Sequence, residues 1–330
     1  MVKVGVVGCG GIGGIHCQGY KSHPKAQLKC VCDIDRAKAD ARAGELGVKA
    51  YYSVKEMLAS EDLDLVGVIT ADHLHFEPVM QALDAGKHVF VEKPLSLKLD
   101  EAKQMVEKAR EKGVKLGVDY NRRFSIPYQK AKEYVKNGTI GTPAFIMFKL
   151  AQGGPEKDHK VKYYNLFELH CHSADLMRHF CGEVEELSAY MTNPRAPLSG
   201  LYTTVAMCLK FKGETTGTLI GSWDSSFANP IEYMEICGGK GFVCVDNIME
   251  GVRLYIHNDR IIQSWRPNPL NETEFQFRTS FISHIHAMVD ALDSGKEMPV
   301  TGEDGLKSLL ILHGAIKSFE EKRSVKMTEL

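Results

Sequence analysis

The sequence predicts an α/β protein with a doubly wound parallel sheet in its first domain and a second, α+β domain built on a mostly antiparallel, open sheet. Up to about residue 120, short apolar runs alternate with helical segments, which is typical of parallel strands covered on both faces. From residue 144 onward, strands follow one another over short turns, which implies antiparallel pairing. The 330 residues suit two domains of about 150 residues each.

In the first domain, strands and helices alternate along the chain. We expect strands at Val2–Val7, Leu28–Asp33, Leu65–Thr70, His88–Glu92 and Leu116–Tyr120, and helices at Gly13–Ser22, Arg36–Leu46, Phe76–Ala85 and Asp100–Glu111. Ser53 and Glu56 have the spacing of a capping box before a further short helix. The pattern changes near residue 122, so the domains are expected at residues 1–122 and 123–330.

The second domain begins with a helix, continues with strands and ends with two helices. The helices are expected at Tyr128–Lys136, Phe281–Leu292 and Asp304–Glu321. The strands are expected at Ala144–Leu150, Val184–Met191, Thr203–Phe211, Thr216–Trp223, Tyr233–Cys237, Phe242–Asp246, Arg253–His257 and Ile261–Trp265. Short links such as Lys212-Gly213-Glu214 join several of these strands as antiparallel neighbours.

Charge and cysteine usage exclude several classes of function. The 41 basic and 42 acidic residues balance, which argues against binding nucleic acid by bulk charge. No run reaches the roughly 18 apolar residues of a membrane helix. The nine cysteines are odd in number, lack a CxxC pair and sit mostly in apolar runs, as buried thiols do in a reducing compartment. We expect a cytoplasmic protein with neither nucleic-acid nor membrane partners.

A glycine-rich turn follows the first strand and opens the first helix. Gly8-Cys9-Gly10-Gly11-Ile12-Gly13 is a GxGxxG pattern in the context that predicts a Rossmann dinucleotide site. Asp33 ends the second strand, where a carboxylate binds ribose hydroxyls and repels a 2′-phosphate, so NAD is favoured over NADP. Arg36 works against that preference, since a nearby arginine can accept the phosphate. The alternatives are a plain glycine turn and, for Asp33, an N-cap of the next helix.

Lys93 lies at the carboxyl end of the strand that precedes Pro94, the edge at which such sheets bind ligands. A lysine there can act as an acid or base, because burial shifts its pKa readily. On this feature alone, an exposed loop lysine is an equally good interpretation.

Six segments together are similar to one family. They are TADHLHFEP (70–78), AGKHV (85–89), EKPL (92–95), GVDYNRRF (117–124), HSADLMRHFCG (172–182) and GEDG (302–305). They resemble the Gfo/Idh/MocA oxidoreductases, which include glucose–fructose oxidoreductase and inositol dehydrogenase. The first-domain motifs are specific, and those of the second domain are looser. The resemblance implies a Rossmann domain, a C-terminal domain whose open sheet builds homodimers or homotetramers, and hydride transfer between a nicotinamide cofactor and a sugar or polyol.

The resemblance also implies site residues. Lys93 corresponds to the family lysine that binds the reacting oxygen and takes part in proton transfer, and His172 corresponds to its acid–base partner. Glu168 stands where many members have aspartate, at a spacing that places it on the same helix face as His172. An unperturbed histidine titrates near ~6.5, which suits proton transfer at neutral pH. The longer Glu168 and the segment around Tyr163, which replaces a glycine-rich run, indicate a different substrate pocket.

We therefore expect catalysis by Lys93, His172 and Glu168. The expected cofactor-binding residues are Gly8, Gly10, Gly11, Ile12, Gly13, Asp33, Arg36, Thr70, His73, His75, Glu92, Lys93, Asn121 and Arg122. The expected substrate-binding residues are Lys93, Asn121, Arg122, Tyr163, Glu168 and His172. For Arg122 the alternative is a solvated pair with Arg123. We expect no metal, because the cluster around His170 and His172 lacks zinc-ligand spacing.

The function predicted from these residues is NAD-dependent hydride transfer to or from a secondary alcohol or ketone of a sugar, polyol or inositol-like substrate. Three alternatives stay open. One is a relative that uses bound NAD for a transient oxidation during glycoside cleavage. Another is a non-catalytic NAD-binding regulator, against which Lys93 and His172 argue. The third is a reductase of another substrate, such as biliverdin or an imine, built on the same folds.

Overall fold

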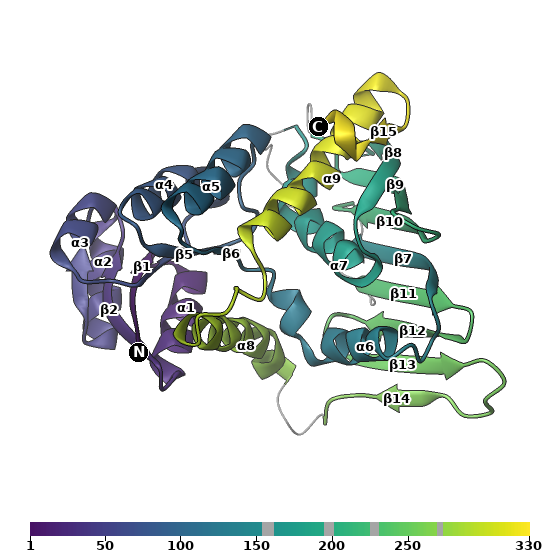
Figure 1. Ribbon diagram of the computed structural model, residues 1–330, viewed down its shortest axis with the longest axis horizontal. Helices are drawn as coiled ribbons and strands as arrows, with labels where there is room; N and C mark the ends of the chain where they lie inside the picture. The colour runs from purple at the N-terminus through teal and green to yellow at the C-terminus, as the bar shows by residue number, and fades with distance from the viewer. Residues whose placement is uncertain (154–161, 195–200, 225–230, 269–272) are drawn as a thin grey trace. The chain divides into compact units, whose positions relative to one another are not determined.

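Six parallel strands form the first sheet, in the order β3-β2-β1-β4-β5-β6. Figure 1 labels β1, β2, β5 and β6 of this sheet. They are β1 (Val2–Val7), β2 (Ala26–Cys32), β3 (Lys49–Tyr51), β4 (Leu65–Val68), β5 (His88–Val91) and β6 (Leu116–Val118). The structure is a computed structural model that describes residues 1–153, 162–194, 201–224, 231–268 and 273–330. The strand order reverses between β1 and β4, and such switch points bind ligands at the carboxyl ends of the strands. The predicted parallel sheet is confirmed, with β3 as an added short edge strand.

Helices connect these strands. They are α1 (Gly11–Ser22), α2 (Arg36–Leu46), α3 (Val54–Ser60), α4 (Phe76–Asp84) and α5 (Leu99–Lys112). The N-cap of α2 is Asp35, whose side chain accepts from the N–H groups of Ala37 and Lys38, so the N-cap alternative for Asp33 is wrong. Ser53 is the N-cap residue of α3 but makes no capping hydrogen bond with its side chain, so the predicted capping box is absent.

The chain divides into two compact units, and one boundary differs from the expected one. The first unit is Met1–Asn121 with Arg278–Lys307, and the second is Arg122–Phe277 with Ser308–Leu330. Most of α8 (Thr273–Asp293) and the start of α9 (Gly302–Glu321) therefore belong with the parallel sheet, whereas the sequence analysis placed them in the second domain. The physical reason is apolar packing: Ile285, Met288 and Val289 of α8 are buried in the first unit's core.

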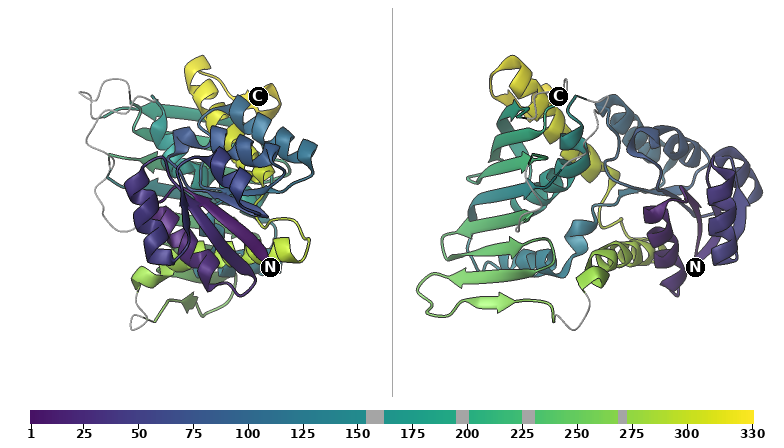
Figure 2. Two further views of the ribbon diagram at one scale, coloured as in Figure 1. Left: turned by 90° about the vertical axis from the view of Figure 1, so that its left-hand side faces the viewer. Right: turned by 180° about the vertical axis from the view of Figure 1, so that it is seen from behind.

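The second unit holds a sheet of nine strands among its described residues, in the order β14-β13-β12-β11-β7-β10-β9-β8-β15 (Figure 1). Figure 2 shows the same sheet from two further sides. They are β7 (Pro143–Ala151), β8 (Val184–Thr192), β9 (Thr204–Phe211), β10 (Thr216–Ser222), β11 (Glu232–Gly238), β12 (Gly241–Asp246), β13 (Gly251–Ile256), β14 (Gln263–Trp265) and β15 (Val325–Lys326). β7 and β10 pair in parallel, and the other described neighbours pair antiparallel. The mostly antiparallel sheet is therefore confirmed.

One face of this sheet is covered and the other is exposed. α6 (Ile126–Lys136), α7 (Cys171–Cys181) and the end of α9 pack on one side, where Phe148, Phe211 and Leu219 are buried. Exposed and buried residues alternate along β9 and β10, as they do in a sheet with one solvated face. The expected open sheet face is thus present.

Candidate functional site

The glycine-rich turn between β1 and α1 depends on two residues that have no room for a side chain. Gly8 has φ +102°, and a Cβ atom there would lie 2.2 Å from the Ile69 carbonyl oxygen. A Cβ at Gly13 would lie 2.0 Å from the Gly8 carbonyl oxygen, so helix and strand approach closely only with glycine. A Cβ at Gly10, by contrast, would meet no atom within 4 Å. The backbone at Gly10, the N-cap of α1, is therefore open to a ligand.

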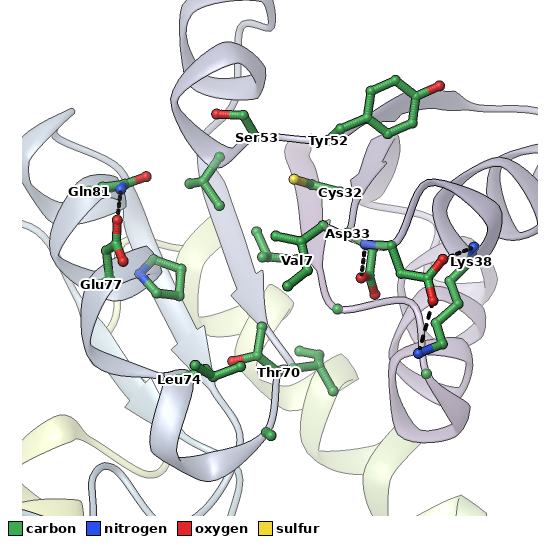
Figure 3. Close-up of a pocket in the computed structure, with 18 residues that line it drawn as sticks. Val7, Cys32, Asp33, Lys38, Tyr52, Ser53, Thr70, Leu74, Glu77 and Gln81 are labelled. Carbon is green, nitrogen blue, oxygen red and sulfur yellow. Dashed lines mark hydrogen bonds and ion pairs between the residues drawn. The ribbon is translucent and has the colours of Figure 1, made fainter.

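Asp33 joins this turn to the carboxyl end of β2. Its carboxylate accepts hydrogen bonds from the N–H of Cys9 at 2.8 Å and of Asp35 at 2.9 Å. Beside it lies a cavity of about 780 Å³, drawn in Figure 3, whose lining includes the predicted residues Gly8, Gly10 and Thr70. A carboxylate beside an open glycine turn has the arrangement that binds a ribose and a pyrophosphate. The residues present thus fit a dinucleotide.

Much of the cavity lining was not predicted from the sequence. Figure 3 shows Glu77 and Gln81 of α4 across the space from Asp33 and Lys38. The further lining residues are Val7, Cys32, Ile34, Asp35, Tyr52, Ser53, Val54, Ile69, Ala71, Leu74 and Pro78. The second acid, Asp35, is held by Lys38 at 3.3 Å. The sequence signal that could have identified Asp35 as a lining residue is its position two residues after Asp33.

Several predicted cofactor residues do not line this cavity. Gly11, Ile12 and Gly13 belong to the first turn of α1, and Ile12 is exposed. Arg36 lies over the Tyr52 ring, 4.2 Å from its centroid. The charged side chains of the lining beside this strand end are the carboxylates of Asp33 and Asp35 and the Lys38 ammonium, which is paired with Asp35. The arrangement disfavours a 2′-phosphate and supports NAD over NADP.

The segment after β4 carries two histidines, one exposed and one buried. His73 is exposed, with its Nδ1 3.3 Å from Asp72. His75 is buried, and its ring nitrogens lie 2.9 Å from the Pro94 carbonyl oxygen and 3.2 Å from that of Thr70. Burial lowers the pKa of His75. His75 therefore links the loops after β4 and β5, and neither histidine lines the cavity.

Lys93 follows β5 and is half-buried. Its backbone N–H donates to Glu92 Oε2 at 3.0 Å, and the other carboxylate oxygen of Glu92 lies 3.1 Å from His16 Nε2. Asn121, after β6, is also buried and donates from its amide to Ser280 Oγ at 2.9 Å. These contacts place Glu92, Lys93 and Asn121 after neighbouring strands of one sheet, as the sequence predicted, although none of them lines the 780 Å³ cavity.

In the second unit, the two arginines after Asn121 are not solvated. Arg122 forms a buried ion pair with Glu232, which also accepts from the Tyr128 hydroxyl at 2.5 Å. Burial raises the pKa of Glu232. Arg123 binds Asp175 with two nitrogens. The alternative of a solvated arginine pair is therefore wrong, and the Arg122 guanidinium is engaged inside its own unit.

The segment that carries Glu168 and His172 is helical but irregular. A π-helical turn at Leu166–His170 leads into α7, and His172 is buried while Glu168 is half-buried. The i→i+5 bonding of a π-turn shifts side chains away from the alignment of a regular α-helix. The alignment of Glu168 and His172 on one helix face stays a prediction, because the π-turn lies between them. Such turns occur frequently at functional sites.

Two neighbours of this turn are engaged in packing. His170 is fully buried, and burial, with the charge of Arg122 added, lowers its pKa to about 3. Its ring occupies the space left by Gly221, where a Cβ would lie 2.0 Å from Nε2. Tyr163 donates its hydroxyl to Glu320 at 2.6 Å and stacks on Tyr202. His170 is thus a packed core residue, and the predicted substrate role of Tyr163 stays a prediction.

Comparisons with known proteins follow the same division of the chain. Residues 2–120 match the model of the oxidoreductase family with an NAD-binding Rossmann fold, and residues 128–244 match the GFO/IDH/MocA C-terminal domain. Myo-inositol 2-dehydrogenase of Thermotoga maritima is 31% identical over 100% of this chain and 99% of its own length. The scyllo-inositol 2-dehydrogenase (NAD(+)) of Bacillus subtilis is 27% identical over 99% of this chain and 96% of its own length.

Solved structures agree in fold. A probable dehydrogenase from Thermotoga maritima has a TM-score of 0.85 at 30% identity and covers all of both chains. An oxidoreductase from Agrobacterium radiobacter, solved with NAD+, L-tartaric acid and magnesium, has a TM-score of 0.90 at 20% identity over 99% of both chains. None of the helices in the described ranges combines the length and apolar character needed to cross a membrane. The expected cofactor, NAD, is confirmed for the Rossmann domain, and the chain belongs to the Gfo/Idh/MocA oxidoreductase family.

Proposed function

We propose that this oxidoreductase is a dehydrogenase that removes hydride from a secondary alcohol of an inositol or related polyol, or reduces the matching ketone, with NAD. The observation that carries the proposal is a full-length similarity, at 31% identity, to a protein named myo-inositol 2-dehydrogenase. The family includes sugar dehydrogenases, so sugars form the second substrate class to be tested.

The first unit would hold NAD in the cavity beside β1 and β2. Asp33 would accept the ribose hydroxyls, and the backbone at Gly10 would receive the pyrophosphate. Asp35, paired with Lys38, belongs to the same lining. Bound NAD supplies the hydride acceptor for the alcohol carbon. The other cofactor contacts that we propose are Gly8, Gly11, Ile12, Gly13, Arg36, Thr70, His73, His75, Glu92, Lys93, Asn121 and Arg122.

The proton chemistry is assigned to Lys93, His172 and Glu168. Lys93 would donate a hydrogen bond to the reacting oxygen and so lower the pKa of the alcohol. The imidazole of His172 would take the hydroxyl proton in oxidation and return it in reduction, and Glu168 would support its positive charge. The family motifs carry these roles, since the EKP and HSAD segments are intact in this chain. Tyr163, Asn121 and Arg122 are the further proposed substrate contacts.

The test is formation of NADH, followed by absorbance, with a panel of inositols, acyclic polyols and sugars. We expect turnover with at least one inositol or polyol, and its collapse in Lys93→Ala and His172→Ala. Lys98→Ala is the matched control, because Lys98 is an exposed lysine of the same loop region, paired with Glu101. If NAD binds but the whole panel is inactive, the dehydrogenase proposal is wrong. Cleavage of a glycoside without net NADH would identify the transient-oxidation alternative.

We also propose that the open sheet face joins copies of this chain into a homodimer or homotetramer. Large apolar side chains are exposed on it: Phe145 and Met147 at 40%, Ile220 at 49% and Tyr190 at 77%. The register places them on one face. Met147 pairs with Thr218, which shares a face with Ile220 two residues further along β10. Ile220 pairs with Ala206, and Ala206 pairs with Tyr190. Contiguous exposed apolar patches are typical of interaction surfaces.

The nine cysteines are present as thiols, six of them buried, which supports the proposed cytoplasmic location.

A further inference from the structure

Four buried polar residues of the first unit form a connected network, which we call the His16 network: His16, Glu92, Asp119 and His284. His16 Nε2 of α1 lies 3.1 Å from Glu92 Oε1 and 3.0 Å from Asp119 Oδ2. His284 Nδ1 of α8 lies 2.6 Å from Asp119 Oδ1. The histidines and Asp119 are fully buried, and Glu92 is 8% exposed. The cofactor cavity does not include any of them.

The network is charged. Burial by itself would lower the pKa of His16, but hydrogen bonds to Asp119 and Glu92 outweigh it and raise that pKa to about 9. Burial likewise would raise the pKa of Asp119, but His16 and His284 lower it to about 2. The titratable groups facing His16 are Glu92 after β5, Asp119 after β6 and Tyr20 from its own helix, while His284 reaches Asp119 from α8. An imidazolium therefore lies between two carboxylates.

The two oxygens of Glu92 have different partners. Oε1 faces His16, and Oε2 accepts the backbone N–H of Lys93 at 3.0 Å. A buried carboxylate that loses such partners is destabilised, so the loop at Lys93 is held in the conformation that keeps both. The amide that this carboxylate holds belongs to Lys93 itself, so the contact fixes the backbone from which the Lys93 side chain extends.

The network also attaches α8 to the carboxyl edge of the sheet. Asp119 and His284 are 165 residues apart in sequence. One turn earlier in α8, Ser280 accepts from the Asn121 amide at 2.9 Å. Helix α8 also contacts α1, because the Ile285 side chain packs against Gly19. A Cβ atom at Gly19 would lie only 2.7 Å from Ile285 Cδ1. The chain after β6 is thus held by two polar contacts from the same helix.

We assign the contacts of His16 to a hydrogen bond and an ion pair. Ligand-type atoms of His16, Glu92 and Asp119 do lie within 4.8 Å of one another. The neighbouring carboxylates raise the pKa of His16 and so favour its protonated ring, whereas a metal ligand must give that proton up. His16 Nε2 is hydrogen-bonded to Glu92 Oε1 at 3.1 Å, and Asp119 Oδ2 lies 3.0 Å from the same nitrogen as an ion-pair contact.

We propose that His16, Asp119 and His284 are positioning residues for Lys93: by holding the Glu92 carboxylate against the Lys93 amide, they fix the backbone from which the Lys93 ammonium reaches the substrate oxygen. The inference rests on the proposed function of Lys93. Small misplacements of a catalytic group cost up to about 100-fold in rate, so the network has a kinetic consequence although it does not touch the substrate.

The test compares His16→Leu and His16→Gln, with His286→Gln as the matched control on α8. Glutamine keeps a neutral donor where Nε2 lies, and leucine keeps none. We expect kcat to fall about 10- to 100-fold in His16→Leu and to recover within about threefold of wild type in His16→Gln. The NAD dissociation constant should stay nearly unchanged. Amide hydrogen exchange at Lys93, measured by NMR without substrate, should accelerate in His16→Leu and not in His16→Gln or His286→Gln.

The outcomes separate this inference from the proposed function. Unchanged Lys93 exchange and unchanged kcat in His16→Leu, with Lys93→Ala inactive, would overturn the positioning role and leave the function intact. Turnover by Lys93→Ala would overturn the proposed function, and the exchange data would still show whether the network holds the loop. If His16→Leu does not fold, Glu92→Gln replaces it, since the neutral amide weakens the bond to the Lys93 N–H and should accelerate its exchange. Unchanged exchange in that variant would contradict the proposal.

Discussion

The Asp33 carboxylate accepts the Cys9 backbone N–H at 2.8 Å, and this contact joins the carboxyl end of β2 to the glycine-rich turn after β1. The same carboxylate also accepts the Asp35 N–H, so its orientation is fixed by two backbone donors. A side chain held in this way faces the ribose position without the entropy loss of being ordered on binding.

Substitution of Asp33 should change cofactor selectivity. Asp33→Ala removes a charged hydrogen-bond acceptor and should weaken NAD binding about 10- to 100-fold. Asp33→Asn keeps an acceptor for the Cys9 N–H and removes the negative charge, so it should narrow the preference for NAD over NADP. Dissociation constants for both nucleotides, by quenching of protein fluorescence, check this. Asp62→Asn, at an exposed acid paired with Lys3, is the control. An unchanged NAD/NADP ratio in both Asp33 variants would contradict the assignment.

Two glycines of the turn should respond differently to alanine. Gly10→Ala meets no atom within 4 Å, so its melting temperature should stay near that of wild type while NAD binding is lost through crowding of the pyrophosphate. Gly13→Ala forces a Cβ to 2.0 Å from a carbonyl oxygen, so the fold itself should lose about 3 kcal/mol or more. Thermal unfolding and NAD titration of both variants measure this. Equal stability of the two would show that the close approach at Gly13 is relaxed in solution.

Stability should depend on pH through His16. Its folded-state pKa of about 9 lies above the ordinary value of 6.5, so its contribution is full below pH 6.5 and is lost as pH rises through 9. The loss is up to about 3 kcal/mol by linkage. Urea unfolding of wild type and His16→Gln from pH 6 to pH 8.5 tests this, a range below the ordinary thiol pKa of 9. We expect a downward slope in wild type that His16→Gln lacks. Parallel curves would contradict a charged His16.

Asp119 should act at the opposite end of the pH scale. Its folded-state pKa of about 2 lies below the ordinary 3.8, so its contribution is present above pH 3.8 and is lost as pH falls through 2. Asp119→Asn should therefore be less stable than wild type at pH 6, and the gap should shrink in acid. Circular dichroism at pH 2 to 6 measures it, with Asp62→Asn as the exposed control. If the difference in stability between wild type and Asp119→Asn does not change with pH, the variant has lost packing and not a charge interaction.

The imidazole of His172 should be replaceable from solution. Proton transfer by a positioned group contributes about 100- to 10,000-fold, so His172→Ala should lose that much of kcat and little of NAD binding. Added imidazole should restore part of kcat in this variant and none in Lys93→Ala. Full activity of His172→Ala would remove this residue from the mechanism.

Charge on the open sheet face should dissociate an oligomer. Ile220→Glu places a carboxylate on a 49%-exposed apolar position, and desolvating it at an interface is costly. We expect a lower mass by light scattering on a sizing column, with Thr218→Glu, on the same strand and face, acting in the same direction. Lys112→Glu, outside the sheet, should leave the mass unchanged. A monomeric wild-type protein would refute the proposed assembly.

The local pattern of the sequence was sufficient for the first unit's sheet and for the cofactor turn. The GxGxxG at Gly8–Gly13 and the acid at Asp33 lie on a strand, a turn and a helix that periodicity identifies, because these signals depend on neighbours a few residues away. The EKP and HSAD segments likewise marked Lys93 and His172. Strand ends differed by a residue or two, as at Val68 and Val118, because the pattern does not state where ladder pairing stops.

The tertiary structure alone decided which distant residues meet. His16, Asp119 and His284 carried no joint signal, since burial and partner choice between residues as far as 165 apart depend on the path of the chain. The same holds for α8, whose apolar face packs on the first unit's core although it follows the second sheet in sequence. The π-turn before His172 also escaped prediction. A helical pattern predicts that a segment is helical, but it does not distinguish a regular turn from the π-turn that carries His170, whose ring packs against Gly221.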